Sequence, residues 1–412
     1  MTTESRLNAA TRQISVRAVI DAVLRQGLIS RAELARVTGL SKQTTSDVVR
    51  ALESGGFLGK SGRVQGATGR SAVTYELRRD AAFVLGIDLG GTKVHLALAD
   101  ITGTILCERV EQTDRRGGLA VVRQIAALLG RLAAEEGMAK ARIRQGAMGS
   151  PGVFDAASGR IMLAPNIPGL DEIDMVAAMR EHLDLEVTIE NDVNLAAEGE
   201  RWRGSCRDVA NFAFVALGTG IGMGIVADGR LLRGARGSAG EIAYLPLGGD
   251  PYDARFYRFG TLESALGGTA ILERYRGLGG RGADDVAGIF ERLRLEDREA
   301  EITLDEVARL LAQALMAARA LLDPDLIVLG GSIGGRAEFV ERVRRALGHR
   351  YPGEPLAVQP SVLGGRATLT GAIGMALARL HDELFGRTAA SWGVVPPPSS
   401  SQTRAAKPLA HA

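Results

Sequence analysis

The feature that most constrains the fold is the stretch 31–54, which has the spacing of two short helices joined by a tight turn. Leu34 and Val37 predict an apolar stripe on the first helix, because they lie about one helical turn apart. Gly39 supplies the backbone freedom that the turn requires. Ser41 is a favourable N-cap for the second helix, which we expect to reach the end of the stretch. The pattern therefore predicts a helix-turn-helix.

The second of these helices has an apolar inner face and a polar outer face. The inner face, at helical spacing, consists of Thr45, Val48, Val49 and Leu52. Polar residues on the first turns are typical of a recognition helix that enters the major groove of DNA. The residues predicted to contact base edges are Lys42, Gln43, Thr44 and Ser46. The alternative is an ordinary helical hairpin with a polar surface, because this spacing also arises by chance.

The residues that follow fit a wing. Gly55 and Gly56 end the helix, a short strand is expected over 57–60, and a loop with Gly and Arg over 61–71 precedes a strand over 72–77. An earlier helix is indicated by apolar residues at helical spacing that stop before Gly27. The outline favours a winged helix over a plain hairpin.

The charge distribution also favours a DNA-binding head. Residues 1–80 contain 13 Lys or Arg and 7 Asp or Glu, a net charge of +6, whereas the whole chain carries only +2. A basic domain on a mildly acidic body is what attraction to phosphates requires. We expect Arg63 and Arg70, in the predicted wing, to contact the DNA backbone.

Length and composition indicate several domains. With 412 residues, 46% of them hydrophobic, the chain can bury more than one core. We expect a DNA-binding domain over 1–81, a two-lobed ligand-sensing domain over 82–385, and a disordered tail over 386–412, which is rich in Pro and Ser.

Other classes of protein are disfavoured. No apolar run approaches the length of a membrane span and the N-terminus lacks a signal-peptide pattern, so we expect a cytoplasmic protein with no membrane partner. Cys107 and Cys206 lie far apart without the spacing of a metal site, which predicts two reduced thiols.

Two glycine turns flanked by apolar strands form a weak internal repeat. The first has the sequence DLGGTK at residues 88–93, and the second has LGTG at residues 217–220. Two such hairpins favour a duplicated architecture whose halves face each other, with turn amides and Thr hydroxyls directed at phosphates. Neither turn is a Walker loop, which would need GxxxxGK followed by Ser or Thr and a helix.

Six further motifs follow the first of these turns in a characteristic order. They are MGSPGVFD at 148–155, APNIPGL at 164–170, ENDVN at 190–194, GEIAY at 240–244, GTLE at 260–263 and LIVLGGS at 326–332. In this order they resemble the ROK family of bacterial sugar kinases and sugar-responsive repressors, over nearly all of residues 12–385. The resemblance implies an α/β fold of the two-lobed, actin-like, ribonuclease-H type, behind an N-terminal winged helix-turn-helix.

The resemblance also implies roles for individual residues. The nucleotide-binding set is Asp88, Gly90, Gly91, Thr92 and Lys93 in the first phosphate loop, Gly218, Thr219 and Gly220 in the second, and Gly330 and Gly331 against the adenosine. The sugar-binding set is Asn166, Asn191, Asp192, Glu241, Tyr244 and Glu263. Asp192 falls where family kinases keep the general base, and short polar side chains can bridge adjacent sugar hydroxyls.

Asp192 has a second interpretation. Asn191 and Asp192 precede a run that begins like a helix, so either residue could be an N-cap or form an Asx-turn. The capping role and the ligand role are compatible with each other.

The sequence departs from the family at a structural zinc site. Family members usually have His at the position of Tyr244, followed by a CxCGxxGC stretch, and these residues hold zinc beside the sugar. Here residues 244–263 contain no His or Cys, and Thr261 occupies the position of the last zinc Cys. We therefore predict that zinc is absent. The change at Tyr244 leaves the identity of the ligand open.

Three functions fit these observations. The first, which we favour, is a sugar-responsive transcriptional repressor that binds operator DNA as a homodimer or higher oligomer and requires no cofactor. The second is a sugar kinase with a DNA-binding appendage, which would use ATP with Mg and Asp192 as catalytic base. The third is a non-catalytic assembly module with a vestigial pocket. A winged helix has no use in a kinase, which favours the first.

Overall fold

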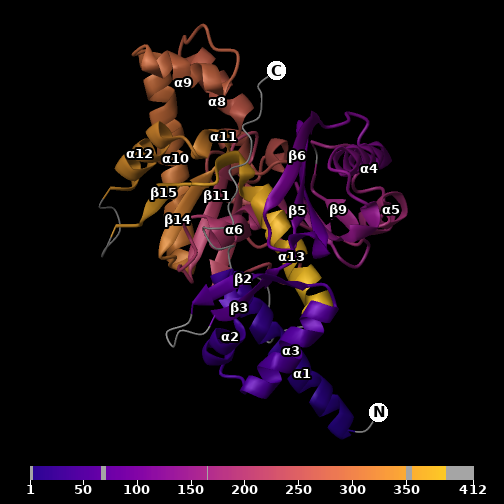
Figure 1. Cartoon of the computed structure of the whole chain (residues 1–412). Coiled ribbons are helices and arrows are strands. Elements are labelled where there is room, and N and C mark those ends of the chain that lie inside the picture. Colours follow the sequence, from indigo (N-terminus) through magenta and orange to yellow (C-terminus); the bar gives the residue numbers. More distant parts are fainter. Residues whose placement is uncertain (1–2, 66–70, 165, 349–354, 387–412) are drawn as a thin grey trace. The chain divides into compact units, whose positions relative to one another are not determined.

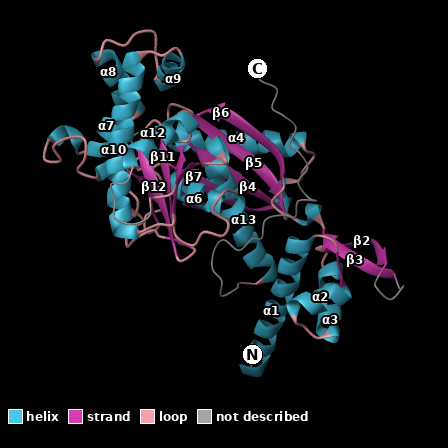
Figure 2. Ribbon diagram, turned by 90° about the vertical axis from the view of Figure 1, so that its left-hand side faces the viewer, coloured by secondary structure: helices cyan, strands magenta, loops and turns pink. Residues whose placement is uncertain are grey.

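The computed structural model describes residues 3–65, 71–164, 166–348 and 355–386 (Figure 1). The chain divides into two compact units, one formed by residues 1–190 with 371–412 and the other by residues 191–370. Their helices and strands can be followed in Figure 2. Of the predicted tail, only Gly386 is among the described residues.

The first unit begins with a winged helix-turn-helix, as predicted. Its elements are α1 (Thr3–Gln26), β1 (Ile29–Ser30), α2 (Arg31–Thr38), α3 (Lys42–Ser54), β2 (Leu58–Gln65) and β3 (Ser71–Leu77). The strands form an antiparallel sheet in the order β1-β3-β2.

Local capping interactions explain the helix-turn-helix. The Ser41 hydroxyl accepts a hydrogen bond from the Thr44 amide at 3.0 Å, and Ser30 caps α2 in the same way. Gly39 ends α2 with φ +69°, a left-handed conformation that favours glycine. These interactions lie within a few residues of each other, which is why the sequence predicted the turn correctly.

The core of this domain differs from the prediction in two places. The predicted inner face of α3 is buried, together with Leu34 of α2. Val37, however, is 37% exposed, so the predicted stripe on α2 is wrong at this residue. Strand β2 continues to Gln65 and pairs with β3, with a register shift between Lys60 and Gly62. Pairing with β3 overrides the loop-like composition of residues 61–65.

The remainder of the first unit surrounds a mixed sheet. Its strands are β4 (Phe83–Leu89), β5 (Lys93–Asp100), β6 (Ile105–Gln112), β7 (Ile143–Ser150) and β10 (Val187–Asn191), with a small hairpin of β8 (Val153–Asp155) and β9 (Arg160–Met162). The helices are α4 (Gly118–Glu135), α5 (Met175–Leu183) and most of α13 (Ala367–Phe385). Apolar residues of α4, including Val122 and Ile125, share one buried cluster with Leu85, Ile87 and Leu96 of the sheet.

The second unit surrounds a second mixed sheet. Its strands are β11 (Phe212–Leu217), β12 (Ile221–Ala227), β13 (Arg230–Leu231), β14 (Leu326–Gly330) and β15 (Val358–Pro360). Its helices are α6 (Asp192–Arg203), α7 (Thr261–Leu266), α8 (Gly268–Gly277), α9 (Val286–Arg294), α10 (Arg298–Leu322), α11 (Gly331–Gly334) and α12 (Ala337–Leu347). Leu311 and Leu315 of α10 lie in the same buried cluster as Val215 and Ile327 of the sheet.

The two large sheets repeat one topology. Their strand orders are β10-β7-β4-β5-β6 and β13-β12-β11-β14-β15. In each, an antiparallel hairpin (β4 with β5, β11 with β12) carries a parallel strand (β7, β14) on its other side. The predicted duplication is therefore confirmed, and with it the predicted fold class. Within the described part of the chain, no helix combines the length and apolar character needed to cross a membrane.

Candidate functional site

The predicted base-reading residues lie at the start of α3. Lys42 and Gln43 are exposed, whereas Thr44 and Ser46 are half-buried. The Gln43 amide donates to the Asp47 carboxylate at 3.0 Å, and the Thr44 hydroxyl lies 2.8 Å from the Ser41 hydroxyl. The helix therefore exposes two long polar side chains, Lys42 and Gln43, whereas the Thr44 hydroxyl has a local partner.

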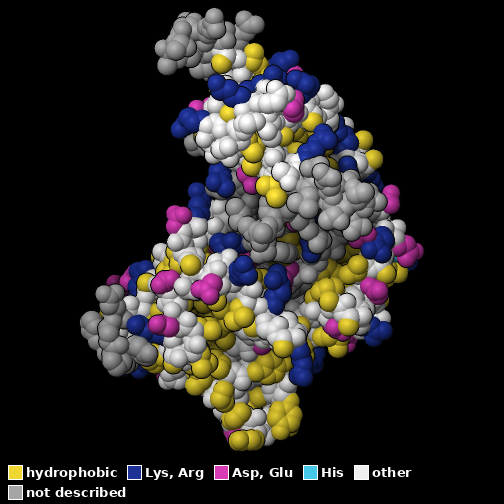
Figure 3. All heavy atoms as spheres, turned by 90° about the horizontal axis from the view of Figure 1, so that it is seen from below, with side chains coloured by type: hydrophobic (Ala, Val, Ile, Leu, Met, Phe, Trp, Pro, Cys, Tyr) yellow, Lys and Arg dark blue, Asp and Glu magenta, His cyan; other side chains and the backbone are white. Residues whose placement is uncertain are grey.

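The basic residues around this helix are partly neutralised by acidic neighbours. Arg36 forms an ion pair with Glu33 one turn earlier, and Arg50 lies 3.5 Å from Asp47. In the view of Figure 3, Lys and Arg side chains occur singly or in small groups among other side chains. Sequence reasoning did not select Arg36 or Arg50, although their exposure on the helices makes them further candidates for phosphate contacts.

One of the two predicted wing residues lies among the described residues. Arg63 lies on β2, opposite Val73 of β3. Arg70 lies outside the described residues.

The first predicted phosphate loop is the turn between β4 and β5. The Gly90 amide donates to the Lys93 carbonyl at 2.9 Å, and the Thr113 hydroxyl donates to the Gly90 carbonyl at 2.7 Å. A Cβ atom on Gly91 would lie 3.0 Å from the Cβ of Asn166. The structure thus brings a predicted sugar residue against this loop, within the first unit.

Asp88 is the charged residue behind this turn. Burial raises the pKa of its carboxyl from 3.8 to about 6, and the positive charge of Lys93 offsets part of that effect. Thr92 and Lys93 themselves are exposed. An exposed ammonium and hydroxyl beside a glycine turn fit the phosphates of a nucleotide.

The second predicted phosphate loop is the turn between β11 and β12. Here the Gly218 amide donates to the Gly220 carbonyl at 2.9 Å, and Thr219 is exposed. A Cβ atom on Gly220 would lie 2.3 Å from the carboxylate of Glu263. Glu263 also accepts a hydrogen bond from the Ile221 amide at 3.0 Å. The turn is therefore tied to a predicted sugar residue on α7.

The predicted adenosine turn packs against the end of β11. Gly331 has φ +80°, and a Cβ atom there would lie 2.3 Å from the Leu217 carbonyl oxygen. A Cβ atom on Gly330 would lie 2.2 Å from the ring of Phe214. Both positions therefore require glycine for close approach of the backbone.

Glu241, Tyr244 and Glu263 are electrostatic neighbours in the second unit. Burial raises the pKa of the Glu241 carboxyl, and the charge of Glu263 raises it further. Burial also raises the pKa of the Tyr244 hydroxyl, with additions from both glutamates. The three polar groups thus form one cluster in which a negative charge on one group disfavours ionisation of its neighbours. Such a cluster suits hydrogen bonding to neutral hydroxyls.

Asn191 and Asp192 occupy the first turn of α6, in the same unit. Asn191 is the N-cap, since its side-chain oxygen accepts from the amides of Val193 and Asn194 at 2.9 and 3.0 Å. Asp192 is the first helical residue, and its carboxylate accepts from the Val193 amide at 2.9 Å. The Val193 side chain lies against Gly222 of β12, the strand whose first residue, Ile221, binds Glu263. Five of the six predicted sugar residues therefore belong to the second unit, and Asn166 belongs to the first.

The segment that would hold the family zinc does not fit a metal ion. The Thr261 hydroxyl donates to the Leu245 carbonyl at 2.8 Å, and the Tyr244 hydroxyl donates to the Arg258 carbonyl at 3.2 Å. Across the described ranges, no group of three or more His, Cys, Asp or Glu side chains could hold a metal. Hydrogen bonds hold the two ends of residues 244–261 together in place of a metal. The absence of zinc stays a prediction.

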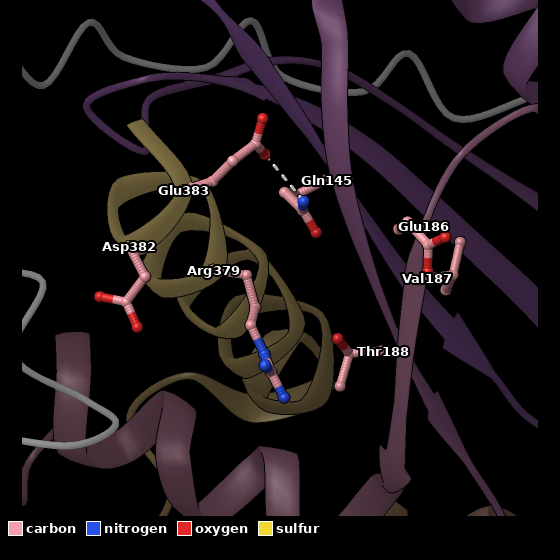
Figure 4. A pocket seen from close by; sticks show the side chains of 7 residues that line it. All are labelled: Gln145, Glu186, Val187, Thr188, Arg379, Asp382 and Glu383. Carbon is pink, nitrogen blue, oxygen red and sulfur yellow. Dashed lines mark hydrogen bonds between the residues drawn. The ribbon is translucent and has the colours of Figure 1, made fainter. Parts of the chain in front are cut away.

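A separate pocket of about 430 Å³ lies in the first unit (Figure 4). It is lined by Gln145, Glu186, Val187, Thr188, Arg379, Asp382 and Glu383, and contains none of the predicted site residues. Its acidic groups are already paired, Glu186 with Arg180, Asp382 with Arg17 and Glu383 with Arg144. Because the pocket shares no residue with the predicted sugar site, we keep that site as the candidate.

Comparisons with known proteins match both parts of the chain. The family model described as ROK family matches residues 84–379, and one described as winged helix-turn-helix DNA-binding matches residues 13–58. A putative xylose repressor from Caldicellulosiruptor sp. is 26% identical over 390 residues, covering 90% of this chain and 97% of that protein. A glucokinase from Halalkalibacterium halodurans is 30% identical over 269 residues, covering 60% of this chain and 80% of that protein.

One solved structure extends over both parts of the chain. It is described as a ROK family transcriptional regulator, a homolog of the E. coli MLC protein, and superimposes with a TM-score of 0.73. It covers 91% of this chain and 98% of its own at 22% identity, which supports the fold.

Proposed function

The chain belongs to the ROK family, and from this premise we propose that it is a DNA-binding repressor of carbohydrate-metabolism genes whose ROK domain senses a sugar or sugar phosphate. The observation that carries the proposal is the winged helix, whose helix α3 presents Lys42 and Gln43 to solvent. The alignment with a putative xylose repressor over 90% of this chain supports it. We further propose that the protein acts in the cytoplasm, where it would meet operator DNA.

The DNA contacts follow from the placement of α3. We propose that Lys42, Gln43, Thr44 and Ser46 read base edges, and that the wing residues Arg63 and Arg70 contact phosphates. One winged helix offers limited surface, so we propose at least a homodimer on two half-sites. Light scattering of the DNA complex tests this, and a monomer bound one-to-one contradicts it.

The sugar contacts follow from the polar cluster in the second unit. Glu241, Tyr244 and Glu263 lie together near the β11–β12 turn. We propose that this cluster, with Asn191, Asp192 and Asn166, binds a monosaccharide or its phosphate without zinc. Carboxylate and amide groups can accept from two adjacent hydroxyls at once. Metal analysis of the purified chain tests the zinc part, and stoichiometric zinc contradicts it.

The first experiment selects DNA duplexes from a random-sequence pool with the full chain and measures their affinity. If Lys42 contacts a base edge, replacing Lys42 by Ala should weaken binding to the selected duplex by about 1–3 kcal/mol. The matched control is Arg123→Ala, which removes one exposed positive charge from α4. Equal losses in the two variants contradict base reading by Lys42.

The second experiment adds D-xylose and D-glucose to the DNA complex. A responding sugar should release the duplex, and Glu241→Ala should abolish the release while leaving DNA affinity intact, because Glu241 and α3 lie in different units. Release from the Glu241→Ala variant at the same sugar concentration contradicts the proposed pocket.

The second candidate function is an ATP-dependent sugar kinase. The first phosphate loop favours it, because Asp88, Thr92 and Lys93 are retained at a glycine turn. Asp192 would take the proton from the attacking hydroxyl, and Mg-bound ATP would supply the phosphoryl group. A coupled assay with a hexose panel tests this, since Asp192→Asn should abolish transfer while largely sparing sugar binding. If the wild-type chain transfers no phosphoryl group to any of the hexoses, the kinase function is contradicted and only the repressor function remains.

A further inference from the structure

Helix α13 passes from one compact unit into the other. Its first residues, Ala367 to Thr370, belong to the second unit, and from Gly371 onward it belongs to the first. At 1.5 Å per residue, its 19 residues form a rod of about 28 Å. A movement at one end of a continuous helix is carried to the other end, because the hydrogen bonds along its axis resist stretching.

The first turn of α13 touches the predicted sugar site. The Thr368 hydroxyl donates to the main-chain oxygen of Asp192 at 3.1 Å, across 176 residues of sequence. Ala367 is buried in one cluster with Ala196 and Ala197 of α6. The start of α13 is therefore packed on α6, the helix whose first residue is Asp192, and a shift of α6 must displace it.

The last turn of α13 touches the DNA-binding domain. The Arg17 side chain of α1, only 7% exposed, donates to the Asp382 carboxylate at 3.0 Å and to the Gly386 carbonyl at 3.5 Å. The rings of Phe385 and Phe57 meet edge to face with centroids 5.2 Å apart. Figure 1 shows α13, in yellow, reaching the indigo N-terminal domain of the same unit.

The Arg17 contact is sensitive to position. Arg17 also donates to the Asp21 carboxylate of its own helix at 3.0 Å, so one buried guanidinium is shared between Asp21 of α1 and Asp382 of α13. Loss of the Asp382 contact would leave the buried guanidinium with Asp21 alone, so the ion pair favours a movement of α1 together with α13. At the preceding residue, the His381 ring nitrogen lies 2.9 Å from the Ile101 carbonyl and anchors the helix to the end of β5.

The winged helix is also joined through the chain itself, by residues 78–82, to the first large sheet. Residues 78–82 are held by Arg79 near Asp100 and by Arg142 near Asp80, all within the first unit. This segment ties the winged helix to the rest of the first unit. Helix α13 has described contacts with both the sugar site and the DNA-binding domain.

We propose that α13 is the coupling element, through which sugar binding at the start of α6 changes the position of the winged helix. The inference rests on the proposed function. Thr368 is the contact at the sugar end and the Arg17–Asp382 ion pair is the contact at the DNA end. Because coupling is reciprocal, DNA binding alters sugar affinity through the same two contacts and by the same factor.

The test measures the coupling ratio, the DNA dissociation constant with saturating sugar divided by that without it. The DNA is a duplex selected by the full chain, and the sugar is whichever of D-xylose and D-glucose the chain binds. Thr368→Val should lower the ratio at least about fivefold, because it keeps the side-chain shape and removes the hydroxyl. The affinity for DNA without sugar and the affinity for sugar without DNA should each stay within about threefold of the wild-type values. Thr368→Ser, which keeps the hydroxyl, should restore the ratio.

Asp382→Asn tests the opposite end and should lower the ratio similarly. Its control is Glu383→Gln, the next residue on the same helix, which pairs with Arg144 and Gln145 and not with α1. Melting temperatures confirm that the variants fold. If Thr368→Val and Asp382→Asn both keep the wild-type ratio, the coupling role of α13 is wrong although the repressor function stands. A wild-type ratio of one with a bound sugar overturns the proposed function and this inference together.

Discussion

The two sheets share one strand order, but their hairpin turns differ in charge. The β4–β5 turn has the buried carboxyl of Asp88 behind it and the exposed ammonium of Lys93 at its end. The β11–β12 turn, residues 217–221, contains no ionisable side chain. Its charge comes from another element, Glu263 of α7, which accepts from the Ile221 amide at 3.0 Å.

This difference indicates how a duplicated architecture specialises. Strand pairing sets the backbone of both turns, so each turn is free to differ in its side chains. A cation beside a glycine turn suits phosphate, whereas a borrowed carboxylate suits sugar hydroxyls. In the proposed function, the first turn retains the chemistry of a kinase and the second is built into the sugar pocket.

The largest expected effect is on stability and concerns Gly331, which follows the parallel strand of the second sheet. Gly331 follows β14 with φ +80°, and a Cβ atom would meet the Leu217 carbonyl at 2.3 Å. We expect Gly331→Ala to lower the free energy of unfolding by about 3 kcal/mol, from backbone strain and overpacking together. Gly229→Ala is the control, since Gly229 has φ +69° but no atom within 4 Å, and should cost about 1 kcal/mol. Equal costs in urea denaturation would remove the packing argument.

The next effect concerns Asp88 and has the opposite sign. Its folded-state pKa, about 6, exceeds the ordinary 3.8, so the folded state holds the proton more tightly and stability falls as pH rises from about 4 to 6. At pH 7 the ionised carboxylate should cost about 2–3 kcal/mol. Asp88→Asn should therefore raise the free energy of unfolding at pH 7 and flatten its pH dependence.

The control for Asp88 is Asp208→Asn, a change of the same kind at an exposed site. Denaturant titrations from pH 4 to 7 make the comparison. Parallel curves for the wild type and Asp88→Asn would mean that this carboxyl is not strained by burial, and the contrast between the two turns would lose its electrostatic basis.

The smallest effect compares the turns directly through sugar affinity. Ala at Gly220 would place its Cβ 2.3 Å from the Glu263 carboxylate, which must move and give up its bond to Ile221. We expect about tenfold weaker binding of D-xylose or D-glucose by calorimetry, the equivalent of one hydrogen bond. Gly91→Ala meets the Cβ of Asn166 at 3.0 Å, and we expect a change within about threefold, since a small shift relieves the contact. Equal losses would erase the distinction between the turns.

The sequence by itself determined the features that depend on neighbours along the chain. The capping of α3 by Ser41, the left-handed Gly39 and the buried face of α3 all follow from spacings of three or four residues, and each was predicted correctly. The ordered motifs likewise indicated the family and the two-lobed fold. Asn191 as an N-cap was one of two open interpretations, because a cap is also a local interaction.

Only the tertiary structure decided the features that join distant segments. Strand β2 extends to Gln65 because β3 pairs with it, and Gly331 needs to be glycine because β11 lies against it. The contacts at the two ends of α13, Thr368 with Asp192 and Arg17 with Asp382, span 176 and 365 residues. No local periodicity encodes such pairs, since burial and charge compensation act between whatever segments the fold brings together.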